Sequence, residues 1–166
     1  MNFKKILIFF LLLNLNNSHV YSIEPDVFVQ STVNRASQIL SENISKEEKI
    51  NKLKAIAKET VDIRAVGFYS LGSARKNLNE SQKQKYSELF ESYFLKSFSS
   101  RLAEYTNPEI DVKSKELISE NYTIVNSVLV ATSSRPEVRI DWRVYTKDKN
   151  NPLIRDLIIE GLSLAR

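Results

Sequence analysis

The stretch VRIDWRVY, residues 138–145, has the pattern that decides the second half of the fold. Its apolar side chains alternate with Arg139, Asp141 and Arg143, and this period of two indicates a strand with one buried face. Three further segments have the same character, and polar loops at 133–136 and 147–152 favour hairpins between them. The predicted strands are 110–112, 122–132, 138–145 and 153–164.

The chain before Pro108 repeats its apolar residues every three or four positions instead, which indicates helices. Ser45 with Glu48, and Asn79 with Gln82, have the spacing of capping boxes that start helices. Segments 25–42, 45–61, 61–78 and 79–107 are therefore predicted to be helical, with a weak or broken end near Gly72. Helices followed by antiparallel strands predict an α+β fold, in which N-terminal helices pack on a curved, mostly antiparallel sheet and enclose an apolar cavity.

The longest predicted helix has a wide and mostly aromatic stripe. Such a stripe is either plain core or the lining of a cavity. Its members are Tyr86, Leu89, Phe90, Tyr93, Phe94, Phe98, Leu102 and Tyr105.

The first 22 residues have the character of a cleaved secretory signal peptide. Lys4 and Lys5 precede an apolar run over residues 6–13, and Val20 and Ser22 suit a cleavage site after Ser22. The run is shorter than the ~20 residues that span a bilayer, although an uncleaved anchor is the alternative interpretation. Residues 23–166 then form a single domain, and its net charge falls from +4 to about +2 because the signal holds two lysines and no acid.

The composition excludes several kinds of chemistry. The only histidine is His19, inside the signal, and there is no cysteine, so ordinary zinc sites, thiol redox chemistry and Ser-His-Asp catalysis are excluded. Three glycines are too few for a glycine-rich phosphate loop. A hydrolase built on two carboxylates stays open, with Asp141, Asp156 and Glu160 as its candidates.

Basic residues gather around the start of the longest helix, and they suit a solvated surface or a patch facing headgroups or a partner. They are not expected to bind nucleic acid, because an exported protein meets little of it. The group consists of Arg64, Arg75, Lys76, Lys83 and Lys85.

Three stretches resemble the MlaC-type phospholipid-binding proteins, also called the toluene-tolerance family. They are AVGFYSLGSARKNLNESQKQKYSELFESYFLKSFSSRLAEY at 65–105, RPEVRIDWRVY at 135–145 and RDLIIEGLSL at 155–164. Their order and spacing match the family over nearly all of the mature chain.

This resemblance implies a soluble, monomeric periplasmic carrier with no enzymatic activity and no cofactor besides phospholipid as cargo. Its implied partners are an inner-membrane ABC lipid-transport complex and an outer-membrane lipoprotein complex, which together maintain the lipid asymmetry of the outer membrane. The physics is consistent: two acyl chains have about 30 methylenes, each costing ~0.8 kcal/mol in water, so unassisted transfer costs on the order of 20 kcal/mol. An exported α+β module that binds another apolar ligand, or acts only in protein interaction, is the alternative.

The resemblance also implies which side chains line the lipid cavity. On the sheet, Gly161 is expected to form a bulge that keeps Leu162 on the face of Ile159. The expected lipid-binding residues are Val138, Ile140, Trp142, Leu157, Ile159, Leu162, Phe68, Leu89, Tyr93 and Phe94.

Two departures from the family pattern stand out. Arg75 takes a place where the family often has an aromatic residue, which puts one wall contact in doubt. The family also continues beyond the last strand into a C-terminal helical segment, so residues 23–166 are expected to be a C-terminally truncated domain with reduced stability or a more open pocket.

Overall fold

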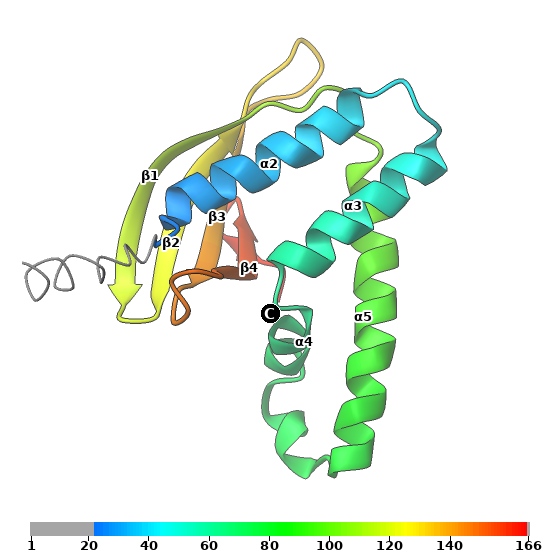
Figure 1. Ribbon diagram of the computed structural model, residues 1–166, viewed down its shortest axis with the longest axis vertical. Coiled ribbons are helices and arrows are strands. Elements are labelled where there is room, and N and C mark those ends of the chain that lie inside the picture. Colours follow the sequence, from blue (N-terminus) through cyan, green and yellow to red (C-terminus); the bar gives the residue numbers. More distant parts are fainter. Residues whose placement is uncertain (1–21, 166) are drawn as a thin grey trace, which may run out of the picture.

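The computed structural model describes residues 22–165, so the predicted signal peptide at 1–22 lies almost wholly outside the described residues. The helices come first along the chain (Figure 1). They are α2 (Pro25–Ser41), α3 (Lys46–Thr60), α4 (Ile63–Ser70), the 3₁₀ helix η1 (Gly72–Asn77) and α5 (Glu80–Leu102).

Five strands follow and form one antiparallel sheet in sequence order. They are β1 (Ile110–Ser119), β2 (Tyr122–Leu129), β3 (Val138–Tyr145), β4 (Leu153–Ile159) and β5 (Leu162–Ser163). The α+β prediction is confirmed by this arrangement.

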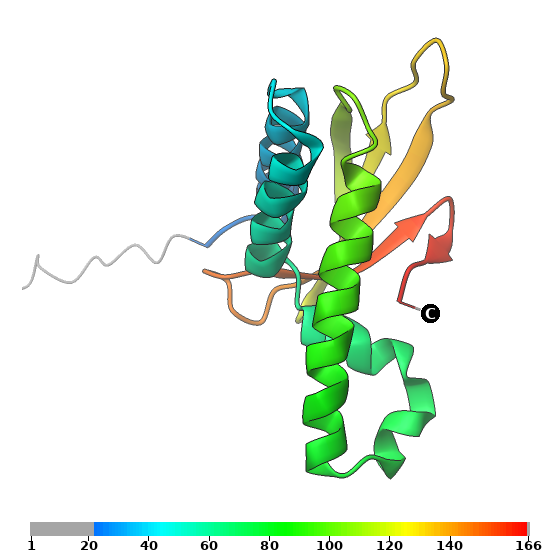
Figure 2. The ribbon, with the colours of Figure 1, turned by 90° about the vertical axis from the view of Figure 1, so that its right-hand side faces the viewer.

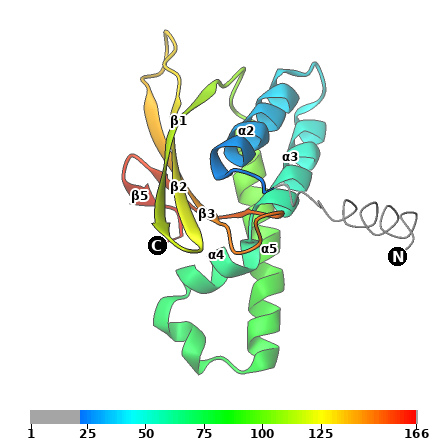
Figure 3. The same ribbon diagram turned by 60° about the vertical axis from the view of Figure 1, so that its left-hand side comes forward.

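The main core lies between α2 and one face of the sheet, with α3 beside α2 (Figure 3). Val29 and Val33 of α2 pack with Val125, Trp142 and other buried side chains of the strands. Alternate residues of β2 and β3 are buried, as the period of two predicts. Trp142 Nε1 donates a 2.8 Å hydrogen bond to the buried Ser127 Oγ, so its one polar atom is satisfied.

A second cluster joins the helices to one another. Ala57, Ile63 and Leu95 are buried in it, from α3, α4 and α5. The aromatic stripe of α5 supplies a ladder of rings four residues apart, with centroid distances of 5.8 Å for Tyr86–Phe90, 6.1 Å for Phe90–Phe94 and 5.2 Å for Phe94–Phe98. Below this cluster α4, η1 and the first half of α5 extend beyond the sheet (Figure 2).

The helix starts are where the capping pairs place them. Ser45 with Glu48, and Asn79 with Gln82, both form complete capping boxes, which confirms the two predicted starts. The helix ends differ from the sequence interpretation: α5 stops at Leu102, six residues before Pro108, and segment 61–78 is divided into α4 and η1. Gly72 has φ +57° at that division, a conformation glycine adopts without steric cost.

The predicted strand 153–164 is wrong as a single strand. Glu160 and Gly161 both have positive φ, 49° and 84°, and they form a two-residue turn between β4 and β5. Ile159 and Leu162 share a face because they are cross-strand partners, and no bulge is needed.

Strand β1 extends seven residues further than the predicted 110–112, and it forms one edge of the sheet. Its second half is exposed and rich in charge, so no buried face revealed it in the sequence. The pairing with β2 shifts register twice, between Val112 and Ser114 and between Leu117 and Ser119.

No helix within residues 22–165 has the length and apolar character that crossing a membrane requires.

Gly67 sets how closely α4 approaches α5. A Cβ at this position would lie 2.7 Å from Phe90 Cδ1 and 2.9 Å from Phe90 Cγ. In an ordinary helix interior, replacing glycine by alanine gains ~0.5–1 kcal/mol. Here the clash, which costs roughly 1–3 kcal/mol, should outweigh that gain.

We therefore expect Gly67→Ala to lower the free energy of unfolding, measured by urea denaturation, by about 1 kcal/mol. In a Phe90→Leu background the same change should cost less, because the ring that it meets is gone. An equal loss in both backgrounds would show that the α4–α5 contact is not the cause.

Candidate functional site

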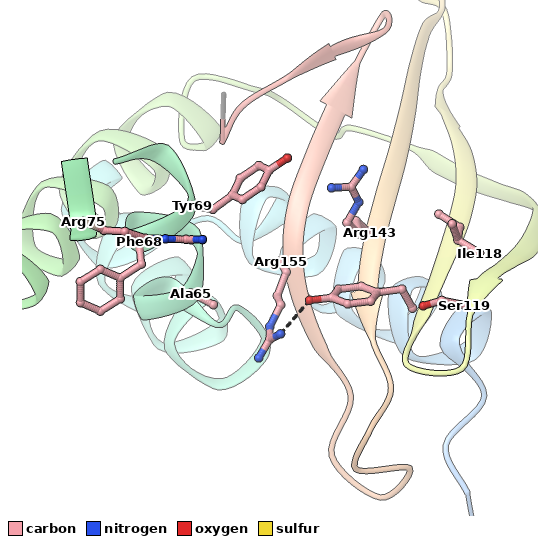
Figure 4. A pocket seen from close by; sticks show the side chains of 9 residues that line it. Ala65, Phe68, Tyr69, Arg75, Ile118, Ser119, Arg143 and Arg155 are labelled. Carbon is pink, nitrogen blue, oxygen red and sulfur yellow. Dashed lines mark hydrogen bonds between the residues drawn. The ribbon is translucent and has the colours of Figure 1, made fainter. Parts of the chain in front are cut away.

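A cleft of about 550 Å³ lies between α4–η1 and the sheet (Figure 4). It is partly open to solvent, and its lining mixes apolar and aromatic side chains with three arginines. Val125 of β2 and Trp142 of β3 are cross-strand partners whose side chains face the main core. Tyr122 and Tyr145 are partners on the alternate face, and Tyr122 lines the cleft. The cleft therefore uses the sheet face opposite the main core. The lining residues are Ala65, Phe68, Tyr69, Arg75, Ile118, Ser119, Tyr122, Arg143 and Arg155.

Helix α4 supplies one wall. Ala65, Phe68 and Tyr69 follow at spacings of three and one, so they share one side of the helix. The opposite side of α4 is turned to α5, where Tyr86 donates a 3.0 Å hydrogen bond to the carbonyl oxygen of Gly67. The helix is thus held from behind while its other side faces the sheet.

Arg155 connects this wall to the sheet. Its Nε and Nη2 lie 2.9 and 2.8 Å from Asp62 Oδ2, and its Nη1 donates a 2.8 Å hydrogen bond to the Tyr122 hydroxyl. The guanidinium also lies 3.5 Å from the centroid of the Tyr145 ring, within the range of a cation–π contact. Burial works to lower the pKa of Arg155, but the hydrogen bonds to Tyr122 and Asp62 outweigh it and raise the pKa above its ordinary value. Arg155 therefore stays charged.

The sequence before α4 explains why Asp62 is available to Arg155. Asp62 is the N-cap of α4, and its Oδ1 accepts a 3.1 Å hydrogen bond from the Ala65 amide. Val61 forms a parallel bridge with Ile154, and the Asp62 amide donates to the Ile154 carbonyl oxygen at 2.9 Å. One carboxylate thus starts a helix with one oxygen and binds the neighbouring strand with the other.

The ten side chains expected to contact lipid do not come together in the structure. Phe68 lines the cleft, and the other nine are not among its lining residues. Ile140 and Trp142 are buried in the main core, and Val138 and Leu157 pack against it. Ile159 is half-buried on β4, and Phe94 packs on the cluster between the helices. Leu89, Tyr93 and Leu162 are 58%, 69% and 74% exposed; contact of these ten with lipid stays a prediction.

The sequence interpretation missed most of the cleft because it searched the apolar face of each strand. The cleft instead uses the alternate face, which carries Tyr122, Arg143 and Tyr145. Tyrosines among arginines on a strand face were the available signal, since aromatic rings there offer apolar surface beside charge. Arg75, noted only as a departure from the family pattern, also lines the cleft.

Each of the three carboxylates considered for catalysis accepts a hydrogen bond from another residue of the chain. Asp141 accepts a 3.0 Å hydrogen bond from Asn126 Nδ2, and Glu160 accepts one from the Arg139 amide. Asp156 is buried and accepts from Ser163 Oγ at 2.7 Å and from the Ala165 amide at 3.2 Å. None of the three lines the cleft, and residues 22–165 contain no group of acidic side chains placed to hold a metal ion.

Comparison with protein families matches residues 30–166 to the family described as MlaC protein, which is most of the chain. The chain belongs to the MlaC family. Comparison with curated protein sequences finds no match.

Among solved structures, the MlaC-family chain is similar to a phospholipid-binding protein from Ralstonia solanacearum, determined in complex with a phospholipid. The two chains are 17% identical, the match covers 86% of this chain and 82% of the other, and the TM-score is 0.71. At that identity the likeness shows a shared fold.

The Arg155–Asp62 pair should contribute more to stability than an exposed pair of the same kind. The Arg155 and Asp62 side chains are only 25% and 21% exposed, so removing one leaves a poorly solvated charge. We expect Arg155→Met to lower the free energy of unfolding by about 1–3 kcal/mol. The matched control is Arg35→Met, which breaks the exposed Arg35–Glu59 pair and should cost less than ~1 kcal/mol.

Urea denaturation of both variants measures the difference. Equal losses would show that the connection between α4 and the sheet adds nothing beyond an ordinary surface pair.

Proposed function

We propose that this MlaC-family protein binds phospholipid in the cleft between α4–η1 and the sheet and carries it through the periplasm. The observation that carries the proposal is the cleft itself, with Phe68, Ile118 and the Tyr122 ring presenting apolar surface in a partly open space. Family membership supports it, and so does the shared fold with a protein solved in complex with phospholipid.

The size of the cleft supports an acyl chain as ligand. A methylene is about as large as a water molecule, which takes ~30 Å³ of liquid volume. A volume of about 550 Å³ then holds roughly 18 methylenes, the content of one acyl chain. A lipid with two chains would extend beyond the cleft through its open side.

Carriage needs no catalytic step. A chain that leaves a bilayer for an equally apolar cleft avoids the ~0.8 kcal/mol per methylene that water would cost. Binding must also be reversible, so a partly open cleft suits a carrier better than a sealed one. In this proposal the carrier exchanges lipid with an inner-membrane ABC lipid-transport complex and with an outer-membrane lipoprotein complex, and the cycle maintains the lipid asymmetry of the outer membrane.

The lipid proposal is tested by filling the cleft. Ala65→Trp places an indole on the wall of α4 that faces the cleft, and Ala55→Trp adds the same group to an exposed position on α3. Each variant and the unchanged protein are purified without detergent, and the extracted lipid is quantified by mass spectrometry. We expect near-stoichiometric phospholipid with the unchanged protein and with Ala55→Trp, and several-fold less with Ala65→Trp.

Recovery of a different apolar molecule would favour the alternative of an exported module for another ligand. Equal phospholipid in all three proteins would place the lipid outside this cleft.

Periplasmic location follows from the proposed signal peptide. Cleavage after Ser22 would leave Ile23 as the first residue, and the Ile23 nitrogen donates a 2.9 Å hydrogen bond to the Lys149 carbonyl oxygen. That bond can form with a free amino terminus as well. We expect N-terminal sequencing of the protein from a periplasmic extract to begin at Ile23; a chain that begins at Met1 in the membrane fraction would instead indicate an uncleaved anchor.

A further inference from the structure

Most of the positively charged side chains that line the cleft have no ion-pair partner within residues 22–165. Of its three arginines, Arg155 is paired with Asp62. Within residues 22–165 no ion pair and no side-chain hydrogen bond joins Arg75 or Arg143 to another residue. None of the described residues that line the cleft is acidic. Within that part of the chain, two guanidinium groups therefore face the cleft without a paired carboxylate.

Arg143 is the more informative of the two, because it lies in the middle of the sheet and is half-buried. Its cross-strand neighbour on β4 is Asp156, the nearest candidate for a partner by register. Asp156 is instead bound to the end of the chain, since Oδ2 accepts from Ser163 Oγ and Oδ1 from the Ala165 amide, and no ion pair joins it to Arg143. A half-buried charge without a partner is costly, so a cation here is better explained by an anion that comes from outside the chain.

Arg75 approaches from the other wall. It belongs to η1, which follows α4, whereas Arg143 belongs to β3 (Figure 4). The apolar side chains of Phe68 and Ile118 also border the same space. Guanidinium groups present planar, forked donors that suit phosphate oxygens, and they do so better than lysine.

We propose that Arg75 and Arg143 bind the phosphate group of the lipid whose acyl chain occupies the cleft. This inference rests on the proposed function and adds a selectivity to it: lipids with a phosphate are preferred over neutral lipids with the same chains. Arg155 takes no part in that contact, since its charge is already balanced by Asp62 and its Nη1 is bound to Tyr122.

The test compares two double variants. Arg75→Gln with Arg143→Gln removes the proposed phosphate contacts. The matched control is Lys76→Gln with Arg139→Gln, which removes the same net charge from exposed neighbours on η1 and on the same face of β3, neither of which lines the cleft. Each purified protein is equilibrated with vesicles that contain equal amounts of phosphatidylglycerol and diacylglycerol with identical acyl chains. The protein is then separated from the vesicles, and both lipids that it holds are quantified by mass spectrometry.

In the unchanged protein and the control, we expect phosphatidylglycerol to exceed diacylglycerol. In the Arg75→Gln, Arg143→Gln variant that ratio should fall roughly tenfold, the order expected for a lost charge-assisted contact. Diacylglycerol uptake should not change, which also shows that the variant is folded. If that variant does not fold, Arg75→Lys with Arg143→Lys keeps the charge, and it should lower the ratio to an intermediate value.

Three results would overturn the proposal in distinguishable ways. An equal ratio in the variant and the control would remove these arginines from phosphate recognition while leaving lipid carriage intact. A thermal shift produced by inorganic phosphate alone, as large as that produced by phosphatidylglycerol, would make free phosphate the ligand. Uptake of neither lipid by any of the proteins would contradict the proposed function itself, and the phosphate site with it.

Discussion

The ion pair between Arg155 and Asp62 is the constraint on which the arrangement of this molecule depends. Helix α2 packs on one side of the sheet, with α3 beside it, whereas α4 lines a cleft on the other side. The chain passes between the two sides at Val61, which pairs with Ile154 of β4. Because Asp62 both caps α4 and binds Arg155, the helix can start only where the strand holds it. The Arg155–Asp62 contact thus helps to fix where α4 lies relative to β4, and so where one wall of the cleft stands.

The two faces of the sheet differ in composition and in packing. One is apolar and dry, and its buried Trp142 has its single donor satisfied by Ser127. The other carries tyrosines and arginines beside a partly open cleft. A core requires close packing, whereas a reversible binding surface requires room and accessible charge, so both cannot occupy one face. With the two separated, release of a ligand from the cleft, as proposed, would leave the core covered.

The fold could be predicted further than the site. Capping pairs and periodicity are local signals, and they located the starts of α3 and α5 and the whole of β3. The exposed half of β1 has no such signal. Glu160 and Gly161 lie inside a short apolar run, and for that reason the sequence suggests a bulge there where the structure has a turn. The cleft joins residues 65–75 to residues 118–155, and which face of a strand meets a distant helix is a tertiary property. The pattern of apolar residues along each strand therefore indicated the apolar faces, and these faces are buried in the core.

The form of strand β1 bears on whether this protein can associate with itself. It is an edge strand with exposed Leu117 and Ile118, which offers backbone donors and acceptors to any neighbouring sheet. Lys113, Lys115 and Glu116 place charge along it, and its two shifts of register interrupt a straight edge. Charge and irregularity both oppose the addition of a second sheet. The edge is thereby protected against self-association, and the proposed carriage of lipid between two membranes by a single chain would gain from that protection.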